Sequence, residues 1–252
     1  MKLYLAGVES LIEPIKYAQP PYILFSFAAC RGSSSTQEKV MELTRCSWCK
    51  DFLCDSGAFT FFTKGHTVTL DEWSRYVDEY IEFINDNNIH YFFELDIDKI
   101  VGINKVEEIR KRIEKRTGKQ CIPVWHISRG WKYFERMCDE YKYVSLGGIV
   151  SSRSKKYKDM FPWFIDYAHK KDVKIHGLGY TDTRMFKQYQ FDSIDSTTWT
   201  VGGRFGEWFD ISGNTLIRNG KNINRKNKRI DGVALHNHNA AVWAQYARIL
   251  DI

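Results

Sequence analysis

The chain has 252 residues, of which 43% are hydrophobic and 15% aromatic, and it carries a formal net charge of +6. This length and apolar content suit one globular domain with a large core, and they exclude a disordered chain. Six cysteines are too few for a disulfide scaffold in a chain of this size, so we expect reduced thiols. The positive charge permits a polyanionic partner but is equally compatible with a basic protein that has none.

The N-terminus carries no signal-peptide pattern, and no stretch of the sequence reaches the length of a transmembrane helix. The apolar run over residues 1–5 is short, and the chain turns acidic at Glu9. We therefore expect a cytoplasmic protein that does not enter a membrane.

The chain alternates short apolar runs, typical of buried strands, with segments of helical period. In chain order, the predicted strands cover residues 2–8, 22–27, 51–59, 91–95, 121–127, 143–146, 173–176 and 191–196. The predicted helices cover residues 10–17, 38–43, 70–84, 104–116, 131–141 and 155–171, with a last short helix from Thr181 or Thr183 to Tyr189. A loop rich in glycine and serine is expected over residues 31–36.

Local chemistry marks three of the helix boundaries. Thr69-Leu70-Asp71-Glu72 has the form of a capping box, in which the threonine and the glutamate each satisfy a free backbone N–H. Gly118 follows the charged helix over 104–116 and is expected to end it. Pro162 either interrupts the helix over 155–171 or starts its main part, because proline is tolerated only in a first turn.

The alternation of apolar strands with helices predicts an α/β fold with a parallel sheet and helices outside it. The number of repeats favours a (β/α)8 TIM-like barrel over an open doubly wound sheet. A dinucleotide-binding fold would also need a Gly-x-Gly-x-x-Gly motif after the first strand, and the sequence has none there. We treat residues 1–252 as one barrel domain, in which residues 196–235 form an irregular insertion or tail that is basic at 221–229.

Two ways of closing the barrel are compatible with the sequence. The strand over 2–8 gives eight strands ending near Ile194. Alternatively, this first strand is an addition, and residues 213–217 or 230–235 supply the closing strand.

Polar residues follow most of the predicted strands. In (β/α)8 barrels the active site lies at the carboxyl ends of the strands. The residues at these ends are Asp55, Asp96, His126, Gly147-Gly148, His176-Gly177 and Asp195. A single aspartate at a strand end is more often a turn or capping residue, but three acids and two histidines on one rim indicate a site. Because glycine lets a flat ligand approach the backbone, the pattern favours a planar, hydrogen-bonding ligand among carboxylates.

Asp192 and Asp195 lie three residues apart, so on a strand their side chains point to opposite faces. One of them can therefore point into the barrel. Carboxylates can act as nucleophile, general acid or general base. Two of them on opposite sides of a glycosidic carbon would allow a double displacement through a covalent intermediate.

Metal binding by the same acids is a competing hypothesis. It is weaker because no His-x-His or His-Glu-x-x-His spacing falls on a strand end. His236 and His238 precede the last helix and are expected to cap or pack. A second candidate set is Cys46, Cys49, Cys54 and His66, although Cys54 belongs to a core strand beside Asp55. We predict no metal and no cofactor.

Six segments resemble, in the same order, motifs of the tRNA-guanine transglycosylase superfamily. They are Cys54-Asp55-Ser56-Gly57-Ala58-Phe59, Phe93-Glu94-Leu95-Asp96, Pro123-Val124-Trp125-His126, Ser145-Leu146-Gly147-Gly148, His176-Gly177-Leu178-Gly179 and Phe191-Asp192-Ser193-Ile194-Asp195-Ser196. Gly202-Gly203-Arg204-Phe205-Gly206 also resembles a Gly-Arg-x-Gly segment of the family. The resemblance covers roughly residues 51–206. Each motif alone is weak, and their order is the specific part.

The resemblance implies a role for each of these residues. Asp195 would be the nucleophile, and Asp55 would act on the base as general acid and base. The residues implied to bind the substrate base are Asp96, His126, Gly147, Gly148, His176 and Gly177.

The chain departs from the family pattern at three places. Ala58 replaces a glycine, and His126 replaces an amide side chain that reads the base. The C-terminal zinc subdomain is missing, since no cysteine follows Cys138. Without that subdomain, the chain looks more like the phage and bacterial branch that places 7-deazaguanines in DNA, which would locate a phage-encoded protein in the host cytoplasm.

The resemblance therefore implies a pentosyltransferase that exchanges guanine for a 7-deazaguanine such as preQ0 in nucleic acid. DNA is the favoured polymer and tRNA the alternative, while the incoming base, the sequence context and the oligomeric state stay open. Two rival hypotheses are a retaining glycoside hydrolase that uses two of the same acids and a catalytically silent nucleic-acid-binding barrel.

Basic residues near the predicted rim are candidates for contacts with phosphate groups. They are Arg153, Lys155, Lys156, Arg204, Lys221, Arg225, Lys226, Lys228 and Arg229. Such charge runs are about as often simply a solvated surface.

Overall fold

The structure is a computed structural model of the chain. It describes residues 1–58, 69–148, 159–180, 182, 188–201, 206–220 and 231–251. None of the helices in these ranges combines the length and the apolar character that a membrane crossing requires.

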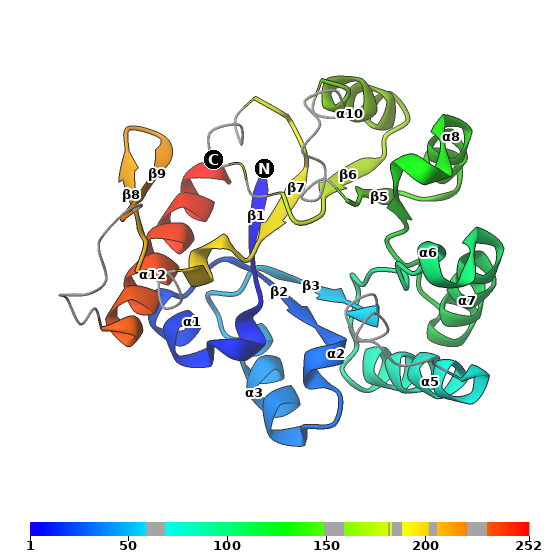
Figure 1. The fold of residues 1–252 in the computed structure, drawn as a ribbon, viewed down its shortest axis with the longest axis horizontal. Coiled ribbons are helices and arrows are strands. Elements are labelled where there is room, and N and C mark those ends of the chain that lie inside the picture. Colours follow the sequence, from blue (N-terminus) through cyan, green and yellow to red (C-terminus); the bar gives the residue numbers. More distant parts are fainter. Residues whose placement is uncertain are drawn as a thin grey trace.

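Seven parallel strands form one curled sheet with helices on its outside (Figure 1). In their order across the sheet, the strands are β3 (Asp51–Asp55), β2 (Tyr22–Ser26), β1 (Lys2–Ala6), β7 (Ser193–Ser196), β6 (Lys174–Gly177), β5 (Tyr143–Leu146) and β4 (Val124–Trp125). The α/β class and the parallel sheet are therefore confirmed. β1 pairs with β2 on one side and with β7 on the other. The hypothesis that the first strand is an addition to the sheet is wrong.

The predicted strand over residues 91–95 is reduced to two isolated bridges. Phe92 forms a parallel bridge with Cys54 of β3, and Phe93 forms one with Ile122 just before β4. Backbone hydrogen bonds join Phe93 N to Cys54 O at 3.0 Å and Glu94 N to Ile122 O at 3.1 Å. The seven-stranded sheet has β3 at one edge and β4 at the other. This segment thus lies between β3 and the residues that lead into β4.

The helices mostly follow their strands in the predicted order. They are α1 (Ile12–Ala18), α2 (Phe27–Cys30), α3 (Ser34–Arg45), α5 (Leu70–Asp86), α6 (Asp98–Val101), α7 (Ile103–Thr117), α8 (Trp131–Glu140), α10 (Phe161–Lys170) and α12 (Gly232–Leu250). The predicted loop over 31–36 ends early, because the Ser33 hydroxyl accepts the Thr36 N–H and starts α3 there. The Thr69 capping box and the left-handed cap at Gly118 are confirmed. Pro162 lies in the first turn of α10, so it starts that helix.

The core has two layers because successive strand residues point to opposite faces of the sheet. The concave face holds a cluster of mostly large apolar side chains, namely Tyr4, Ala6, Tyr22, Leu24, Leu53, Phe93, Ile122 and Val124. The residues between them, such as Leu5, Ile23 and Cys54, pack against the helices outside. This alternation determines which residues of each strand can reach a site inside the curl.

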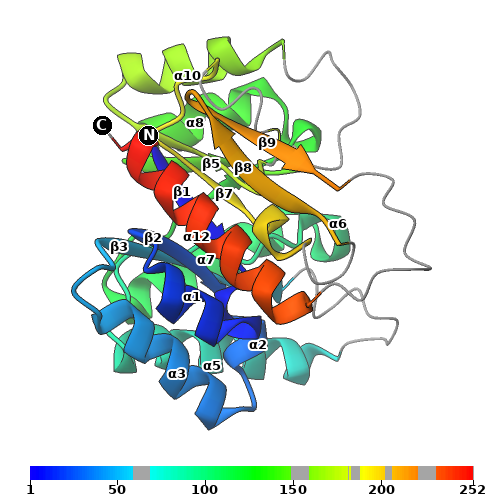
Figure 2. The same ribbon diagram turned by 90° about the vertical axis from the view of Figure 1, so that its left-hand side faces the viewer.

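The part of residues 196–235 that the structure describes is more regular than expected. Strands β8 (Trp208–Ser212) and β9 (Thr215–Asn219) form an antiparallel hairpin, which lies beside α12 in Figure 2. Residues 213–217 therefore do not close the large sheet, and Gly232 already begins α12. An antiparallel pair needs only a short turn, and Gly213 supplies one with a φ of 58°.

Candidate active site

Asp195 points to the inner face of the sheet from the middle of β7. It is almost fully buried, with 5% of the residue exposed. Its Oδ1 atom accepts hydrogen bonds from the Gly179 N–H, at 2.6 Å, and pairs with His176 Nε2 at 3.1 Å. These two contacts give the carboxylate a fixed orientation.

Asp192 faces the other side of the same chain segment. Its Oδ2 atom accepts the Ile175 N–H at 2.8 Å and pairs with His169 Nε2 of α10 at 3.0 Å. The opposite orientation of the two aspartates is confirmed, and only Asp195 reaches the inner face.

Asp55 is the last residue of β3 and lies on the inner face. It is close enough to Asp195 and Asp96 to interact with their charges. Burial, together with the negative charges of Asp195 and Asp96, raises the pKa of this carboxyl from 3.8 to about 7. A backbone hydrogen bond from Gly57 opposes the shift. A carboxyl with this pKa is partly protonated and partly ionised near neutral pH, so it can both give and take a proton.

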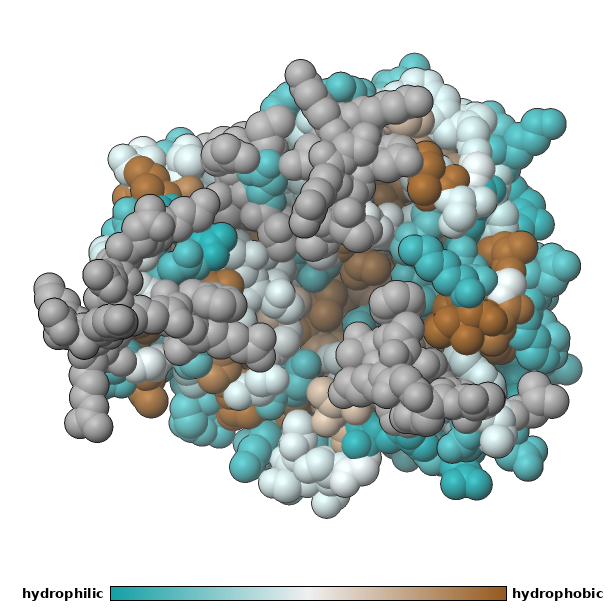
Figure 3. All heavy atoms as spheres, in the orientation of Figure 1, coloured by the Kyte–Doolittle hydropathy of each residue, from teal (hydrophilic) through white to brown (hydrophobic). Residues whose placement is uncertain are grey.

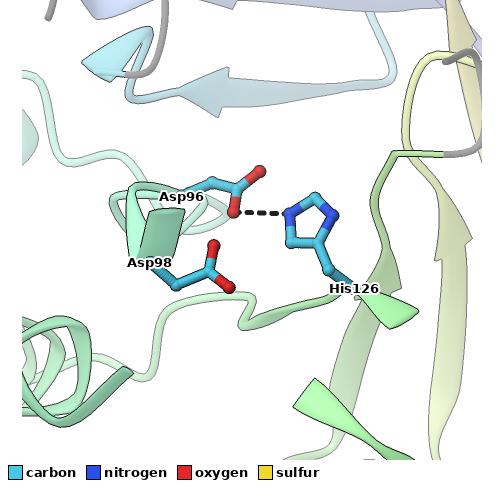
Figure 4. A group of neighbouring side chains, drawn as sticks. All are labelled: Asp96, Asp98 and His126. Atoms are coloured by element: carbon cyan, nitrogen blue, oxygen red, sulfur yellow. Dashed lines mark hydrogen bonds and ion pairs between the residues drawn. The ribbon is translucent and has the colours of Figure 1, made fainter. Parts of the chain in front are cut away.

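Asp96 and His126 form a pair at the ends of the neighbouring segments. His126 Nε2 lies 2.6 Å from Asp96 Oδ1, and the two side chains point toward each other in Figure 4. Both are only partly buried. Such a pair can present a carboxylate oxygen to the N–H donors at the edge of a purine base.

A buried network of ion pairs, formed by Glu94, Arg110 and Arg129, lies next to the Asp96–His126 pair. Glu94 is fully buried between Arg110, at 3.1 Å, and Arg129, at 2.6 Å. Arg129 also lies 3.6 Å from Asp96 Oδ1 and 3.5 Å from Asp98 Oδ2. The guanidinium therefore stabilises the two carboxylates that flank His126.

Asp96, Asp98 and His126 are also the described residues that could hold a metal ion. One ligand atom from each lies within 4.8 Å of the others, and Figure 4 shows the Asp98 carboxylate below the Asp96–His126 pair. Two carboxylates and an imidazole suit a divalent cation. However, Arg129 already places a positive charge against both carboxylates, and a nearby like charge disfavours a second cation.

Gly147 lies directly against the imidazole of His126. A Cβ atom at this position would meet His126 Cε1 at 2.6 Å and Val124 Cγ1 at 2.5 Å. Gly148 follows in a left-handed conformation with a φ of 72° and is exposed. The glycine pair thus makes room for the His126 ring and lets the backbone approach the site.

The substitution Gly147→Ala should push the His126 ring away from Asp96. An added Cβ would lie only 2.6 Å from His126 Cε1, so the ring would have to shift. If the site binds a base, as the sequence predicts, we expect the KM for that base to rise about tenfold or more, the cost of a roughly 1 Å displacement in a positioned site. Thermal unfolding of the variant would control for loss of the fold. An unchanged KM would show that the position of His126 is unimportant for binding.

Two residues predicted to bind the base, His176 and Gly177, are both buried. His176 is completely buried, with 0% exposed, and both of its ring nitrogens are occupied by Ser193 and Asp195. Gly177 is buried on the outer face, where an added Cβ would meet Ile194 Cγ2 at 3.2 Å. A strand residue next to an inward-facing histidine must point outward, so Gly177 can reach the inside of the sheet only through its backbone.

The candidate cysteine site does not assemble among the described residues. Cys54 is buried on the outer face of β3, and burial raises the pKa of its thiol well above the usual value. His66 lies outside the described residues. His236 and His238 lie within α12 rather than before it, and they bond to the carbonyls of Thr200 and Phe209, at 3.2 and 2.8 Å.

The nine basic residues proposed to contact phosphate all lie outside the described residues, and so do residues 181 and 183–187 of the short helix expected before Tyr189. The space-filling view shows a hollow at the centre of the molecule with hydrophobic side chains at its floor (Figure 3). This hollow coincides with the inside of the curled sheet in the same orientation (Figure 1).

Several residues of the site were not recognised in the sequence. Arg129, Glu94 and Asp98 support the Asp96–His126 pair, while Ser193 and the Gly179 amide lie behind Asp195. The alternation of residues in β7 could have identified Ser193, which lies on the same face as Asp195. The buried ion pairs involve three separate segments and leave no local pattern.

The sequence matches no protein-family model and no curated protein.

Proposed function

We propose that the protein is a nucleic-acid guanine transglycosylase that exchanges guanine for a 7-deazaguanine base through a covalent intermediate on Asp195. The observation that carries the proposal is the contrast between two carboxylates on one inner face. Asp195 accepts the Gly179 N–H and pairs with His176 Nε2, whereas burial and charge repulsion raise the pKa of Asp55 to about 7. One group suits attack on a sugar carbon, and the other suits proton transfer to a base.

The proposed fold is a closed (β/α)8 barrel in which the segment over residues 91–95 acts as the eighth strand. The bridges of Phe92 to Cys54 and of Phe93 to Ile122 support this closure, because they connect the two outer strands of the seven-stranded sheet. Closure places Asp55, Asp96, His126 and Asp195 on one rim, at the carboxyl ends of their strands.

In the proposed reaction, a carboxylate oxygen of Asp195 attacks C1′ of a guanosine or deoxyguanosine. The C1′–N9 bond breaks, its electron pair leaves with guanine, and Asp55 supplies the proton that the base takes up. A 7-deazaguanine then enters, loses its proton to Asp55 and forms the new bond to C1′ as the ester bond to Asp195 breaks.

The Asp96–His126 pair would read the edge of the base. A carboxylate can accept the N–H groups that guanine and 7-deazaguanines share along that edge. The target nucleotide must leave the base stack first, which costs a few kcal/mol in a duplex. DNA remains the favoured polymer on the resemblance described above, with tRNA as the alternative.

One experiment tests this proposal against its two rivals. The protein is incubated with double-stranded DNA, single-stranded DNA or tRNA together with labelled guanine or preQ0, and label in the polymer is counted. Incorporation into either polymer supports the proposal. Binding of nucleic acid without incorporation supports a silent binding barrel, and release of sugar from a glycoside without any base supports a glycoside hydrolase, which the same two carboxylates could serve.

A further inference from the structure

A chain of hydrogen bonds connects Asp195 of β7 with side chains of β6 and β5 on the inner face of the sheet. His176 Nε2 lies 3.1 Å from Asp195 Oδ1, and His176 Nδ1 lies 2.6 Å from Ser193 Oγ. Ser193 Oγ in turn bonds to the Tyr143 hydroxyl.

The imidazole has no access to solvent or substrate. It is 0% exposed and is surrounded by aromatic rings, with the Phe93 ring centre at 5.2 Å and the Tyr4 ring centre at 6.2 Å. A buried imidazole needs partners for both nitrogens, and here it has them. His176 therefore acts only through Asp195, as a positioning residue.

With Asp195 ionised and His176 neutral, counting donors and acceptors leaves one arrangement of protons. An ionised Asp195 can only accept, so His176 Nε2 must carry the proton, and in a neutral ring Nδ1 must then accept from Ser193. Ser193 oxygen accepts in turn from Tyr143. Burial raises the pKa of the Tyr143 hydroxyl, which keeps this last group protonated and able to donate.

Both N–H donors meet the same oxygen of Asp195. The Gly179 amide lies 2.6 Å from Oδ1, the atom that also bonds to His176. Among the described residues, Oδ2 has no such partner. A free carboxylate oxygen beside a bonded one is the better placed of the two for attack.

We propose that His176 and the Gly179 amide hold Asp195 by Oδ1, leave Oδ2 as the attacking atom, and keep the glycosyl ester reversible. This inference rests on the proposed function. Oδ2 forms the bond to C1′, and Oδ1 becomes the carbonyl oxygen of the ester. Hydrogen bonds to a charged acceptor are stronger than those to a neutral carbonyl. The two donors therefore stabilise the free carboxylate more than the ester, and the second base can displace Asp195 readily.

The substitution His176→Leu removes one donor without adding a charge. We expect the equilibrium between free enzyme and covalent adduct, measured on denaturing gels at fixed concentrations of guanine and oligonucleotide, to shift about tenfold toward the adduct. Incorporation of the second base should slow, while the KM for the base stays unchanged because the ring does not touch the base. His176→Gln retains an N–H near the position of Nε2 and should restore most of the wild-type equilibrium.

His169→Leu is the matched control. His169 pairs with Asp192 at 3.0 Å on the outer side of the same segment, and its loss should leave the adduct equilibrium unchanged. The role of His176 would be refuted if the adduct fraction and the turnover rate both fell in His176→Leu. It would also be refuted if the adduct fraction rose equally in His176→Leu and His169→Leu.

The proton positions can be tested without any substrate. In ¹⁵N NMR spectra of labelled imidazoles, the signal lost in His176→Gln should show Nε2 protonated and Nδ1 unprotonated, and Ser193→Ala should disturb that tautomer. A proton on Nδ1 would overturn the inference. A wild-type protein that exchanges no base refutes the proposed function, whereas an active protein whose adduct equilibrium ignores His176→Leu refutes the positioning role alone.

Discussion

Replacing Asp195 with asparagine is expected to abolish base exchange, with a loss of about 10⁴-fold or more. The amide has no charge with which to attack C1′, and the loss of a nucleophile removes the covalent route altogether. Asparagine keeps the shape of the side chain, and its oxygen can still accept the Gly179 N–H, so the fold should be retained. The measurement is incorporation of labelled guanine together with the covalent adduct on a denaturing gel.

Asp192→Asn is the matched control for this substitution. Asp192 is three residues away, has the same chemistry and faces the outside of the sheet, where it bonds to Ile175 and His169. Its exchange activity should stay near the wild-type level. Exchange that persists in Asp195→Asn, or that is lost equally in Asp192→Asn, would remove Asp195 from the role of nucleophile.

Asp55→Asn should lower exchange by about 10²- to 10⁴-fold, the usual contribution of a positioned general acid and base. The wild-type pH profile should report the same group, because burial raises the pKa of Asp55 to about 7. In the proposed reaction, release of guanine needs the protonated carboxyl, so adduct formation in a single turnover should decline as the pH rises above about 7. Entry of the second base needs the ionised carboxylate and should decline below about 7.

The two limbs are measured separately, by adduct formation without an incoming base and by consumption of a preformed adduct. Asp55→Asn should flatten both. Asp51→Asn, at the opposite end of β3, should lower neither limb selectively. A wild-type profile without an inflection near pH 7 on either limb would contradict the assignment of Asp55.

The same shift in pKa has a consequence for stability. A carboxyl whose pKa is raised on folding binds its proton more tightly in the folded state. The contribution of Asp55 to the stability of the fold therefore falls as the pH rises from about 4 to about 7, the window between the two pKa values. Asparagine cannot ionise, so Asp55→Asn should unfold at a higher temperature than the wild type above pH 7. The variant would then be more stable and much less active, which separates a catalytic loss from a folding defect.

The repeating pattern of the sequence was sufficient to predict most strands and helices. Apolar runs at regular spacing predicted the strands that carry Asp55 and Asp195. The Thr69 capping box and Gly118 predicted helix ends. The segment over 91–95 was weaker than predicted because its pairing is limited to single bridges of Phe92 and Phe93. The hairpin of β8 and β9 was not predicted. Its two strands pair with each other and contact the last helix, and they do not join the large sheet.

The inner-face position of Asp195 was also predictable, since the period of two along a strand separates it from Asp192 whatever the rest of the fold does. The same rule explains why Gly177 faces outward beside His176. The strand pattern does not determine the distances between side chains on different strands. Most of the chemistry of the site depends on those distances.

The sequence by itself thus determined the fold class, the order of the elements and the face of the sheet that each strand residue occupies, because these follow from local periodicity. Only the tertiary structure decided which polar groups meet. It placed His176 and the Gly179 amide on one oxygen of Asp195, set Asp55 near two other acids, and placed Arg129 behind Asp96. Burial and charge act over a few ångströms in space, between residues that lie up to 140 positions apart in the chain, from Asp55 to Asp195.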